Sequence, residues 1–263
     1  MSSSAVVVIP ARWGSTRFPG KPLCKILGKT LIERVWRAAC RAESVDQVLV
    51  ATDDDRIAEH VAALGGRPVL TDRGCANGTE RVRAALEVAA LCPDIIVNLQ
   101  GDAVLTPPRV IDALVEVMRV GADVDIATPA LRFSWEQLDQ FVAERKEGQV
   151  GGTTVTFARN GDALYFSKAV IPNIRKRAHG PCPVFRHIGL YAYTRSALDR
   201  WLSLPPTPLE EVEQLEQLRA LEHGMRIRVI EVDYGGRPHG SVDNPSDVAF
   251  VEQVLRAEGE ASP

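Results

Sequence analysis

Four consecutive β-branched residues near the start of the chain, Val6 to Ile9, constrain its fold more than any other stretch. An uninterrupted run of this kind is typical of a strand that is buried on both faces of a parallel sheet. Pro10 ends the run, because proline has no N–H to donate to a sheet ladder. The stretch therefore predicts an α/β fold with this strand near the centre of the sheet.

A cationic loop follows this strand directly. Arg12, Arg17 and Lys21 stand five and four residues apart. The residues between them that permit tight turns are Gly14, Ser15, Thr16 and Gly20. Three cations and free backbone N–H groups at the carboxyl end of a strand can surround a polyphosphate. The alternative is a solvated basic surface loop, and neither a Walker A nor a dinucleotide-binding spacing occurs here.

Length, charge and cysteine content narrow the class of protein. A chain of 263 residues suits one large α/β domain or a domain with a substantial insertion. The net charge of −3 argues against nucleic acid or anionic membrane as a partner. Five cysteines without a C-x-x-C pair are typical of reduced thiols. With no signal-like N-terminus and no span-length apolar stretch, we expect a cytoplasmic protein.

Apolar stretches with strand and helix periodicity alternate along the chain, which predicts a doubly wound, mostly parallel sheet. Predicted strands cover 48–51, 68–71, 94–99, 125–128 and 227–232, and predicted helices cover 30–42, 57–64, 79–91, 110–117, 135–145 and 207–222. The last of these helices is expected to turn Leu209, Val212, Leu215 and Leu218 inward. We predict a core formed by 1–129 and 196–263, with a smaller β-rich lid at 130–195.

Aspartates follow several of the predicted strands. Asp102 comes directly after the strand-like run 94–99, at the sheet edge where α/β proteins bind ligands, and is a candidate magnesium ligand. The alternative for Asp102 is an aspartate in a turn. The triplet 53–55 has the composition of a metal site, but we expect it to cap a helix, and Asp247 to do the same.

The segment Asn77-Gly78-Thr79-Glu80-Arg81 stands at the start of a predicted helix. A loop of this composition can contact the edge of a nucleotide base. It also has the pattern of a helix N-cap with Glu80 in the first turn. The two interpretations are compatible.

The loop residues resemble the opening signature of a known family. Ile9-Pro10-Ala11-Arg12, Ser15-Thr16-Arg17 and Pro19-Gly20-Lys21-Pro22 are similar to the first motif of the CMP-Kdo synthetases, cytidylyltransferases that activate 3-deoxy-manno-octulosonate with CTP for lipopolysaccharide. Further motifs in the same order extend the resemblance over nearly the whole chain. It implies a Rossmann-like nucleotidyltransferase fold, cytidylyl transfer and a homodimer formed through the lid.

The resemblance also implies roles for individual residues. Arg17, Lys21, Asp102 and Asp243 are expected to be catalytic, with Asp102 and Asp243 holding Mg²⁺. The expected nucleotide-binding residues are Pro10, Ala11, Arg12, Ser15, Arg17, Lys21, Asn77, Gly78, Arg81 and Gln100. The expected acceptor-binding residues are Gln100, Lys168, His187, Tyr191, Glu216 and Gln217.

Three departures from the family pattern bear on the acceptor. Ala103-Val104 replace Glu-Pro, Gly151-Gly152 fall where a Val-Lys-Val-Val strand is usual, and Lys168 replaces an arginine. We interpret all three as changes on the acceptor side. Two acceptors therefore remain open: the eight-carbon sugar acid, and a small phosphonate such as phosphonoformate in antibiotic biosynthesis.

Two other function classes remain as alternatives. One is a non-catalytic nucleotide-binding relative, against which both candidate metal-binding carboxylates argue. The other is a sugar-1-phosphate nucleotidyltransferase, whose usual Gly-x-Gly loop is missing here.

Overall fold

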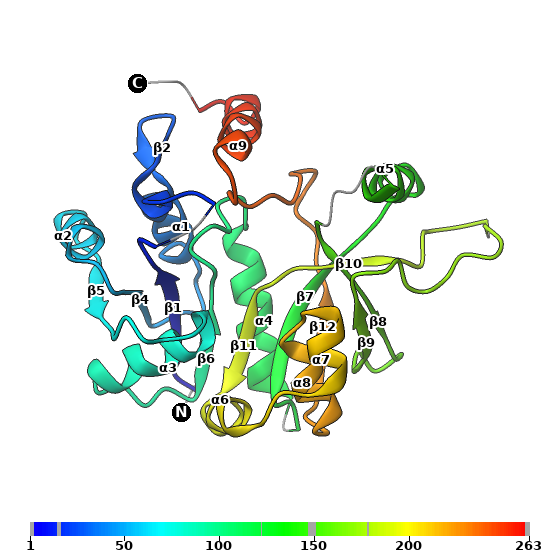
Figure 1. Ribbon diagram of the computed structural model, residues 1–263, viewed down its shortest axis with the longest axis horizontal. Coiled ribbons are helices and arrows are strands. Elements are labelled where there is room, and N and C mark those ends of the chain that lie inside the picture. Colours follow the sequence, from blue (N-terminus) through cyan, green and yellow to red (C-terminus); the bar gives the residue numbers. More distant parts are fainter. Residues whose placement is uncertain (1–2, 15–16, 122, 147–150, 178, 261–263) are drawn as a thin grey trace.

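The protein is organised around one ten-stranded sheet. The computed structural model describes residues 3–14, 17–121, 123–146, 151–177 and 179–260. The strand order is β5-β4-β1-β6-β11-β7-β10-β8-β9, and β12 pairs with β7 (Figure 1). The bounds of these strands are β1 Ala5–Ala11, β4 Gln47–Thr52, β5 Arg67–Leu70, β6 Ile95–Asn98, β7 Ile126–Arg132, β8 Thr153–Phe157, β9 Ala163–Ser167, β10 Phe185–His187, β11 Tyr191–Thr194 and β12 Ile227–Glu231. A separate hairpin consists of β2 Lys25–Ile26 and β3 Lys29–Thr30.

Helices cover both faces of the sheet, so the predicted doubly wound α/β fold is confirmed. Their bounds are α1 Leu31–Ala39, α2 Asp55–Ala63, α3 Gly78–Val88, α4 Pro108–Val120, α5 Trp135–Lys146, α6 Arg195–Ser203, α7 Pro208–Glu213, α8 Gln217–Glu222 and α9 Pro245–Ala257. Helices α1, α2, α4 and α9 pack on one face, and α3, α6 and α8 on the other. A 3₁₀ turn, η1, covers Lys21–Leu23.

The central strand β1 shows why its sequence is uninterrupted. It pairs in parallel with β4 on one side and β6 on the other. Val7 and Ile9 enter the core under α1 and α4, whereas Val6 and Val8 enter the core under α3. A strand between two neighbours and two helical layers has no solvated face, so every side chain in the run is apolar.

The loops that follow the parallel strands β1 and β6 lie at the same edge of the sheet. β1 and β6 are neighbours, so the loop after Ala11 and the residues Gln100 to Asp102 meet there. Gly101 permits this approach, because a Cβ at this position would lie 2.7 Å from the Pro10 carbonyl oxygen. The segment before α9 joins them through a hydrogen bond from Val242 N to Asp102 O, 3.2 Å long.

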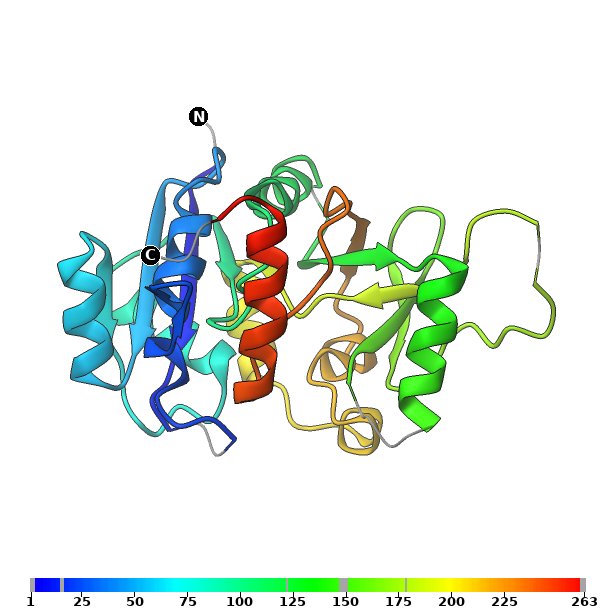
Figure 2. The same ribbon diagram turned by 90° about the horizontal axis from the view of Figure 1, so that it is seen from above.

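The predicted lid, 130–195, continues the same sheet. β10 and β8 are antiparallel to their neighbours, and β9 forms the outer edge. β11, which belongs to this segment, lies between β6 and β7 in the middle of the sheet. Figure 2 shows α5 beside the outer strands and α9 between them and the first strands of the chain. The division into core and lid stays a prediction.

The single helix expected over 207–222 is wrong. The chain forms α7 and α8 instead, because Gln214 adopts a left-handed conformation with φ 55°. The break changes the helical register: Leu215 and Leu218 are buried as expected, whereas Val212 is 83% exposed.

Other expectations concern termini and thiols. Asp54 caps α2, and Asp247 accepts hydrogen bonds from Asp243 N and Asn244 N at the start of α9, so both capping predictions are confirmed. All five cysteines are free. Among the described residues, no helix is long and apolar enough to cross a membrane.

Candidate active site

The cationic loop folds back on itself before it reaches the sheet edge. Gly20 has φ 71°, and its N–H donates to the Trp13 carbonyl at 3.1 Å. The Trp13 indole lies against Gly20 on one side and carries the Arg56 guanidinium 3.3 Å from its centroid. This packing fixes the end of the loop, so that Lys21 begins η1 beside the carboxyl end of β6.

The cations of the loop face the two predicted metal-binding carboxylates. Lys21 Nζ lies 2.7 Å from Asp102 Oδ2 and 3.9 Å from Asp243 Oδ1. Arg17 Nη2 lies 2.9 Å from Asp243 Oδ1. Two aspartates that are far apart in sequence thus converge on a single cation.

This geometry fits a magnesium site that substrate phosphates complete. The structure brings no group of three or more His, Cys, Asp or Glu side chains together as metal ligands, within the residues it describes. Magnesium is commonly held by one or two carboxylates together with phosphate oxygens and water. Asp102 and Asp243 provide such a pair, and in this structure Lys21 is hydrogen-bonded to Asp102 and Arg17 to Asp243.

The segment predicted to contact a base begins α3. Asn77 caps this helix through its side chain, which accepts from Glu80 N at 2.9 Å, so the N-cap interpretation is confirmed. Arg81 is almost completely buried, and its guanidinium donates to Asp53 at 3.0 Å and to Thr71 at 2.7 Å. Gly78 faces the side chains of Pro10 and Gln100, where a Cβ would meet Pro10 Cγ at 3.3 Å. The α3 N-terminus is therefore fixed beside the carboxyl end of β1.

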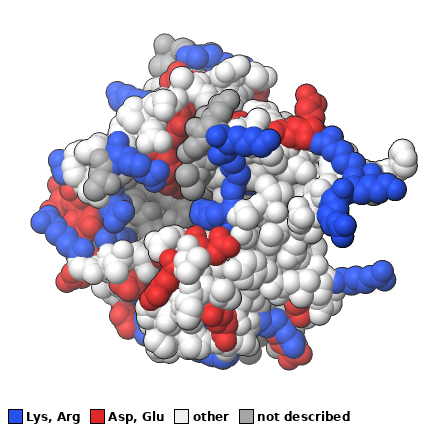
Figure 3. All heavy atoms as spheres, turned by 45° about the vertical axis from the view of Figure 1, so that its right-hand side comes forward, with Lys and Arg blue, Asp and Glu red and all other residues white. Residues whose placement is uncertain are grey.

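These elements enclose a cavity of about 310 Å³, called here the β1–β6 cavity. It is lined by Pro10, Ala11, Arg12, Arg17, Lys21, Pro22, Cys75, Ala76, Asn77, Gly78, Arg81, Gln100, Gly101, Asp102 and Asp243. Every predicted nucleotide-binding or metal-binding residue is among them except Ser15, which lies outside the described residues. Cys75 and Ala76 were missed, although their position just before Asn77 was a usable signal. Figure 3 shows a hollowed face of the molecule with Lys and Arg side chains on the rim of the hollow.

Three predicted acceptor-binding residues gather on the α6–α8 face of the sheet. His187 is buried, and its Nε2 lies 2.9 Å from Thr128 Oγ1. Its ring packs on Tyr191 with centroids 5.5 Å apart. Burial, with smaller contributions from His239 and Lys168, lowers the pKa of His187 to about 3. The pKa of Lys168 is also lowered, chiefly by burial.

The pair Glu216-Gln217 approaches the same face from the start of α8. Burial raises the pKa of Glu216, and Glu210 and Glu80 add to this effect while Arg219 opposes it. Gln217 is buried, and its Nε2 donates to no residue that the structure describes. The Glu216 charge also contributes to the raised pKa of Tyr191. An amide donor and a carboxyl group are thus available beside the tyrosine.

Val104 and Gly152 do not face His187. Val104 is buried in the core under α1, α4 and α9, so this residue makes a packing contact. Its neighbour Ala103 donates its N–H to the carbonyl oxygen of Gln100 at 3.0 Å, beside a predicted acceptor-binding residue. Gly152 faces Phe141 and Arg186, on the opposite face of β10 from His187. The interpretation of the three departures as changes on the acceptor side stays a prediction.

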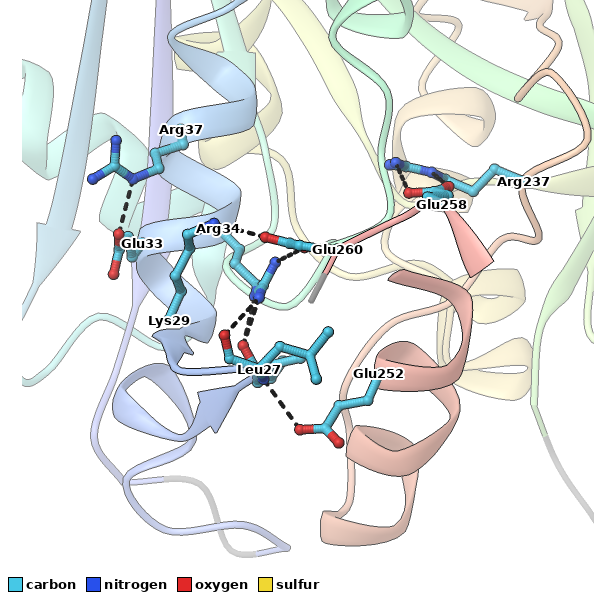
Figure 4. Close-up of polar contacts among 10 residues, drawn as sticks. Leu27, Lys29, Glu33, Arg34, Arg37, Arg237, Glu252, Glu258 and Glu260 are labelled. Carbon is cyan, nitrogen blue, oxygen red and sulfur yellow. Dashed lines mark hydrogen bonds and ion pairs between the residues drawn. The ribbon is translucent and has the colours of Figure 1, made fainter. Parts of the chain in front are cut away.

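Helix α9 fixes Asp243 from a distance. The helix starts next to Asp243, and its far end is attached to α1 and the β2–β3 hairpin (Figure 4). Glu252 accepts from Leu27 N at 3.1 Å. Glu260, just beyond the helix, accepts from Lys29 at 2.6 Å and from the buried Arg34 at 2.7 Å. These contacts connect the carboxylate to the segment that also carries Lys21.

A doubly wound sheet with cations and paired carboxylates at its parallel-strand edge defines the class of α/β nucleotidyltransferases. A family model described as Cytidylyltransferase matches residues 6–227. The 3-deoxy-manno-octulosonate cytidylyltransferase of Maricaulis maris is 51% identical over 98% of this chain and 99% of its own length. The enzyme of the same name from Chlamydia trachomatis serovar L2 is 42% identical over 100% of this chain and 98% of its own.

Structural comparison agrees. The structure of a CMP:2-keto-3-deoxy-manno-octonic acid synthetase complexed with CTP superposes with a TM-score of 0.86, at 35% identity, over 97% of this chain and 100% of that one. The chain belongs to the cytidylyltransferase family and, within it, to the CMP-Kdo synthetases. It is a CTP-dependent cytidylyltransferase, which argues against the non-catalytic relative, and its membership of this family argues against the sugar-1-phosphate nucleotidyltransferase.

Proposed function

We propose that this enzyme transfers CMP from CTP to 3-deoxy-manno-octulosonate and releases pyrophosphate. The observation that carries the proposal is the convergence of Arg17, Lys21, Asp102 and Asp243 in the β1–β6 cavity. A chain with this cavity is 51% identical to an enzyme named for that reaction.

Different residues of the β1–β6 cavity bind different parts of CTP. Arg12, Arg17 and Lys21 neutralise the triphosphate, which lowers the barrier by stabilising charge that moves onto the leaving pyrophosphate. The residues at the start of α3, together with Gln100, hold the cytidine. A hydroxyl oxygen of the acceptor forms a bond to the α-phosphorus as the bond from that phosphorus to the bridging oxygen breaks.

Asp102 and Asp243 would hold Mg²⁺, which would supply positive charge against the phosphates. The same two carboxylates are paired with Lys21 and Arg17. The phosphates of CTP would compete with these carboxylates for Lys21 and Arg17.

The acceptor site suits a hydroxylated carboxylic acid. Lys168 provides a cation, the unpartnered Gln217 Nε2 provides a donor, and His187 is neutral at physiological pH. Because Val104 and Gly152 lie away from these residues, they no longer argue for an altered acceptor. The relatives' names favour the sugar acid over a phosphonate.

The test is initial-rate pyrophosphate release with CTP and Mg²⁺ against a panel of acceptors. The panel contains 3-deoxy-manno-octulosonate, its amino analogue, sialic acid and phosphonoformate. We expect turnover with the first to exceed that with phosphonoformate at least a hundredfold. Turnover with phosphonoformate alone, or with no acceptor in the panel, would refute the proposal.

Two further properties belong to the same proposal. We infer a homodimer from the family resemblance, which light scattering of the purified chain can measure. The cytoplasmic location stays a prediction.

A further inference from the structure

A second cavity, of about 650 Å³, lies on the opposite face of the sheet from His187; it is called here the α5 cavity. Successive residues of β10 alternate between the two faces. His187 packs on Phe166 and Tyr191, whereas Arg186 packs on Phe133 and Phe141. The walls of the α5 cavity include Phe133, Phe141, Arg186, Arg237, His239 and Phe250.

Arg186 lines this cavity. Its guanidinium has five N–H donors, and among the described residues the structure gives it only aromatic contacts and the longer-range charges of Glu144 and Arg145. Its carbon Cζ lies 5.3 Å from the Phe141 centroid and 5.8 Å from that of Phe133. Cation–π contacts offset part of the cost of removing the charge from water, but they satisfy none of the donors. Burial lowers the pKa of Arg186, and Arg145 adds to this while Glu144 opposes it.

The other charged groups of the cavity are already engaged. Arg132 is paired with Glu231, and Arg237 with Glu258. Two acidic residues of the wall have other hydrogen-bond partners: Glu144 accepts from Gln140 Nε2 at 2.9 Å, and Asp233 accepts from Gly235 N at 2.7 Å. Within the described part of the chain, no carboxylate therefore lies within ion-pair distance of the Arg186 guanidinium.

A second polar group in the wall is also unsatisfied. Nδ1 of His239 is buried and has no hydrogen-bond partner among the described residues. In addition, Gly152 leaves room for the guanidinium, because a Cβ there would lie 3.2 Å from Arg186 Nη2 and 2.9 Å from Phe141 Cε2. The departure from the family pattern at Gly152 thus leaves space for Arg186 beside the two rings.

We propose that the α5 cavity binds a small anion that carries a carboxylate or phosphate group, with Arg186 as its anchor. A planar guanidinium binds such groups through two parallel hydrogen bonds, and its apolar flanks suit the carbon skeleton of the ligand. His239 lies four residues before Asp243. A bound anion would therefore connect the outer strands to the segment that carries a catalytic carboxylate.

Selenate, an analogue of phosphate with an anomalous X-ray signal, locates the site directly. Crystals of the full chain soaked in selenate should give an anomalous peak within hydrogen-bond distance of the Arg186 guanidinium. That peak is separate from any at Arg17 and Lys21, so its presence does not depend on the proposed catalytic function. Three results would overturn the proposal: no peak at Arg186, an ion pair between Arg186 and Glu144, or a carboxylate from a second copy of the chain.

Calorimetric titration with inorganic phosphate tests the anchor in solution. We expect Arg186→Met to weaken binding at least tenfold relative to the wild type, because charge-assisted hydrogen bonds are lost. Arg177→Gln, which removes an exposed arginine from the neighbouring loop, is the matched control and should leave the affinity unchanged. Each titration is made with saturating CTP, which fills the β1–β6 cavity, so that the heat reports on the α5 cavity alone. Equal affinity in wild type and Arg186→Met would refute the assignment, and the crystallographic test stands even if that variant does not fold.

Discussion

His187 should make the protein sensitive to mild acid. The imidazole is buried under Phe166 and Tyr191, and its pKa falls to about 3 from an ordinary value of 6.5, first because of burial. In the unfolded chain the ring is free to take up a proton at its ordinary pKa. The folded state therefore binds fewer protons than the unfolded state between these two values, so stability rises with pH across this window.

The size of this effect on the free energy of unfolding follows from the pKa of His187 in the unfolded chain. At pH 5, unfolded His187 is almost completely protonated, whereas the folded ring is neutral. Because the folded ring stays neutral, the free energy of unfolding is about 2 kcal/mol lower at pH 5 than at pH 8. This figure is the same for any pKa of folded His187 below about 4. His239, whose pKa falls to about 4 through burial and the nearby Arg186, adds a similar amount. Glu216 acts in the opposite direction, because its pKa is raised.

Urea unfolding at a series of pH values measures how the free energy of unfolding depends on pH. We expect the free energy of unfolding of the wild type to fall by about 3–4 kcal/mol from pH 8 to pH 5. In His187→Gln, where the amide can still bond to Thr128, the fall should be smaller by about 2 kcal/mol. Identical pH dependence in the two proteins would refute the inference that His187 is held neutral by burial.

Three further substitutions, one of them with a matched control, test the site and the contacts that hold it in place. Asp243→Asn should lower kcat about a hundredfold in stopped-flow kinetics, and unchanged kcat would contradict the proposed metal-binding role of Asp243. Metal-free CTP should bind this variant more tightly in calorimetry, because a carboxylate that competes for the phosphate-binding cations is gone. Gly101→Ala should lower the free energy of unfolding by about 1–3 kcal/mol in urea, since its Cβ would meet the Pro10 carbonyl oxygen. Glu260→Gln should lower the free energy of unfolding by about 1–2 kcal/mol. Its control Glu33→Gln breaks only an exposed pair within α1 and should lower it by less than about 0.5 kcal/mol. Equal losses in the two variants would show that the attachment of α9 through Glu260 does not stabilise the fold more than an ordinary surface pair.

Local signals predicted the parts of the fold whose causes are local. The β-branched run of β1 indicated a strand without a solvated face, and the structure confirms it. Asp54, Asn77 and Asp247 were predictable as helix caps because their partners are backbone N–H groups no more than four residues away in the sequence. Asp102 could be placed at the sheet edge from the end of its own strand.

Features of the structure that depend on contacts between segments far apart in the sequence could not be predicted from local sequence patterns. The approach of Asp243 to Lys21 depends on α9, whose far end is attached to α1 by Glu260, and only the family resemblance indicated it. The side of the sheet faced by Val104 or Gly152 depends on tertiary packing, so the sequence alone could not place either residue relative to the predicted acceptor-binding residues. The left-handed Gln214 has no sequence signal, since a glutamine is an ordinary helix residue.

Phosphorus NMR of one reaction mixture tests the central claim most directly. The mixture contains the enzyme, CTP, Mg²⁺ and 3-deoxy-manno-octulosonate, and a parallel sample contains Asp102→Asn in place of the wild type. We predict that wild-type enzyme converts the three CTP resonances into one phosphodiester resonance and one pyrophosphate resonance in equal molar amounts, and that Asp102→Asn does so at least a hundredfold more slowly. Pyrophosphate without the phosphodiester, or equal rates in the two samples, would contradict the account.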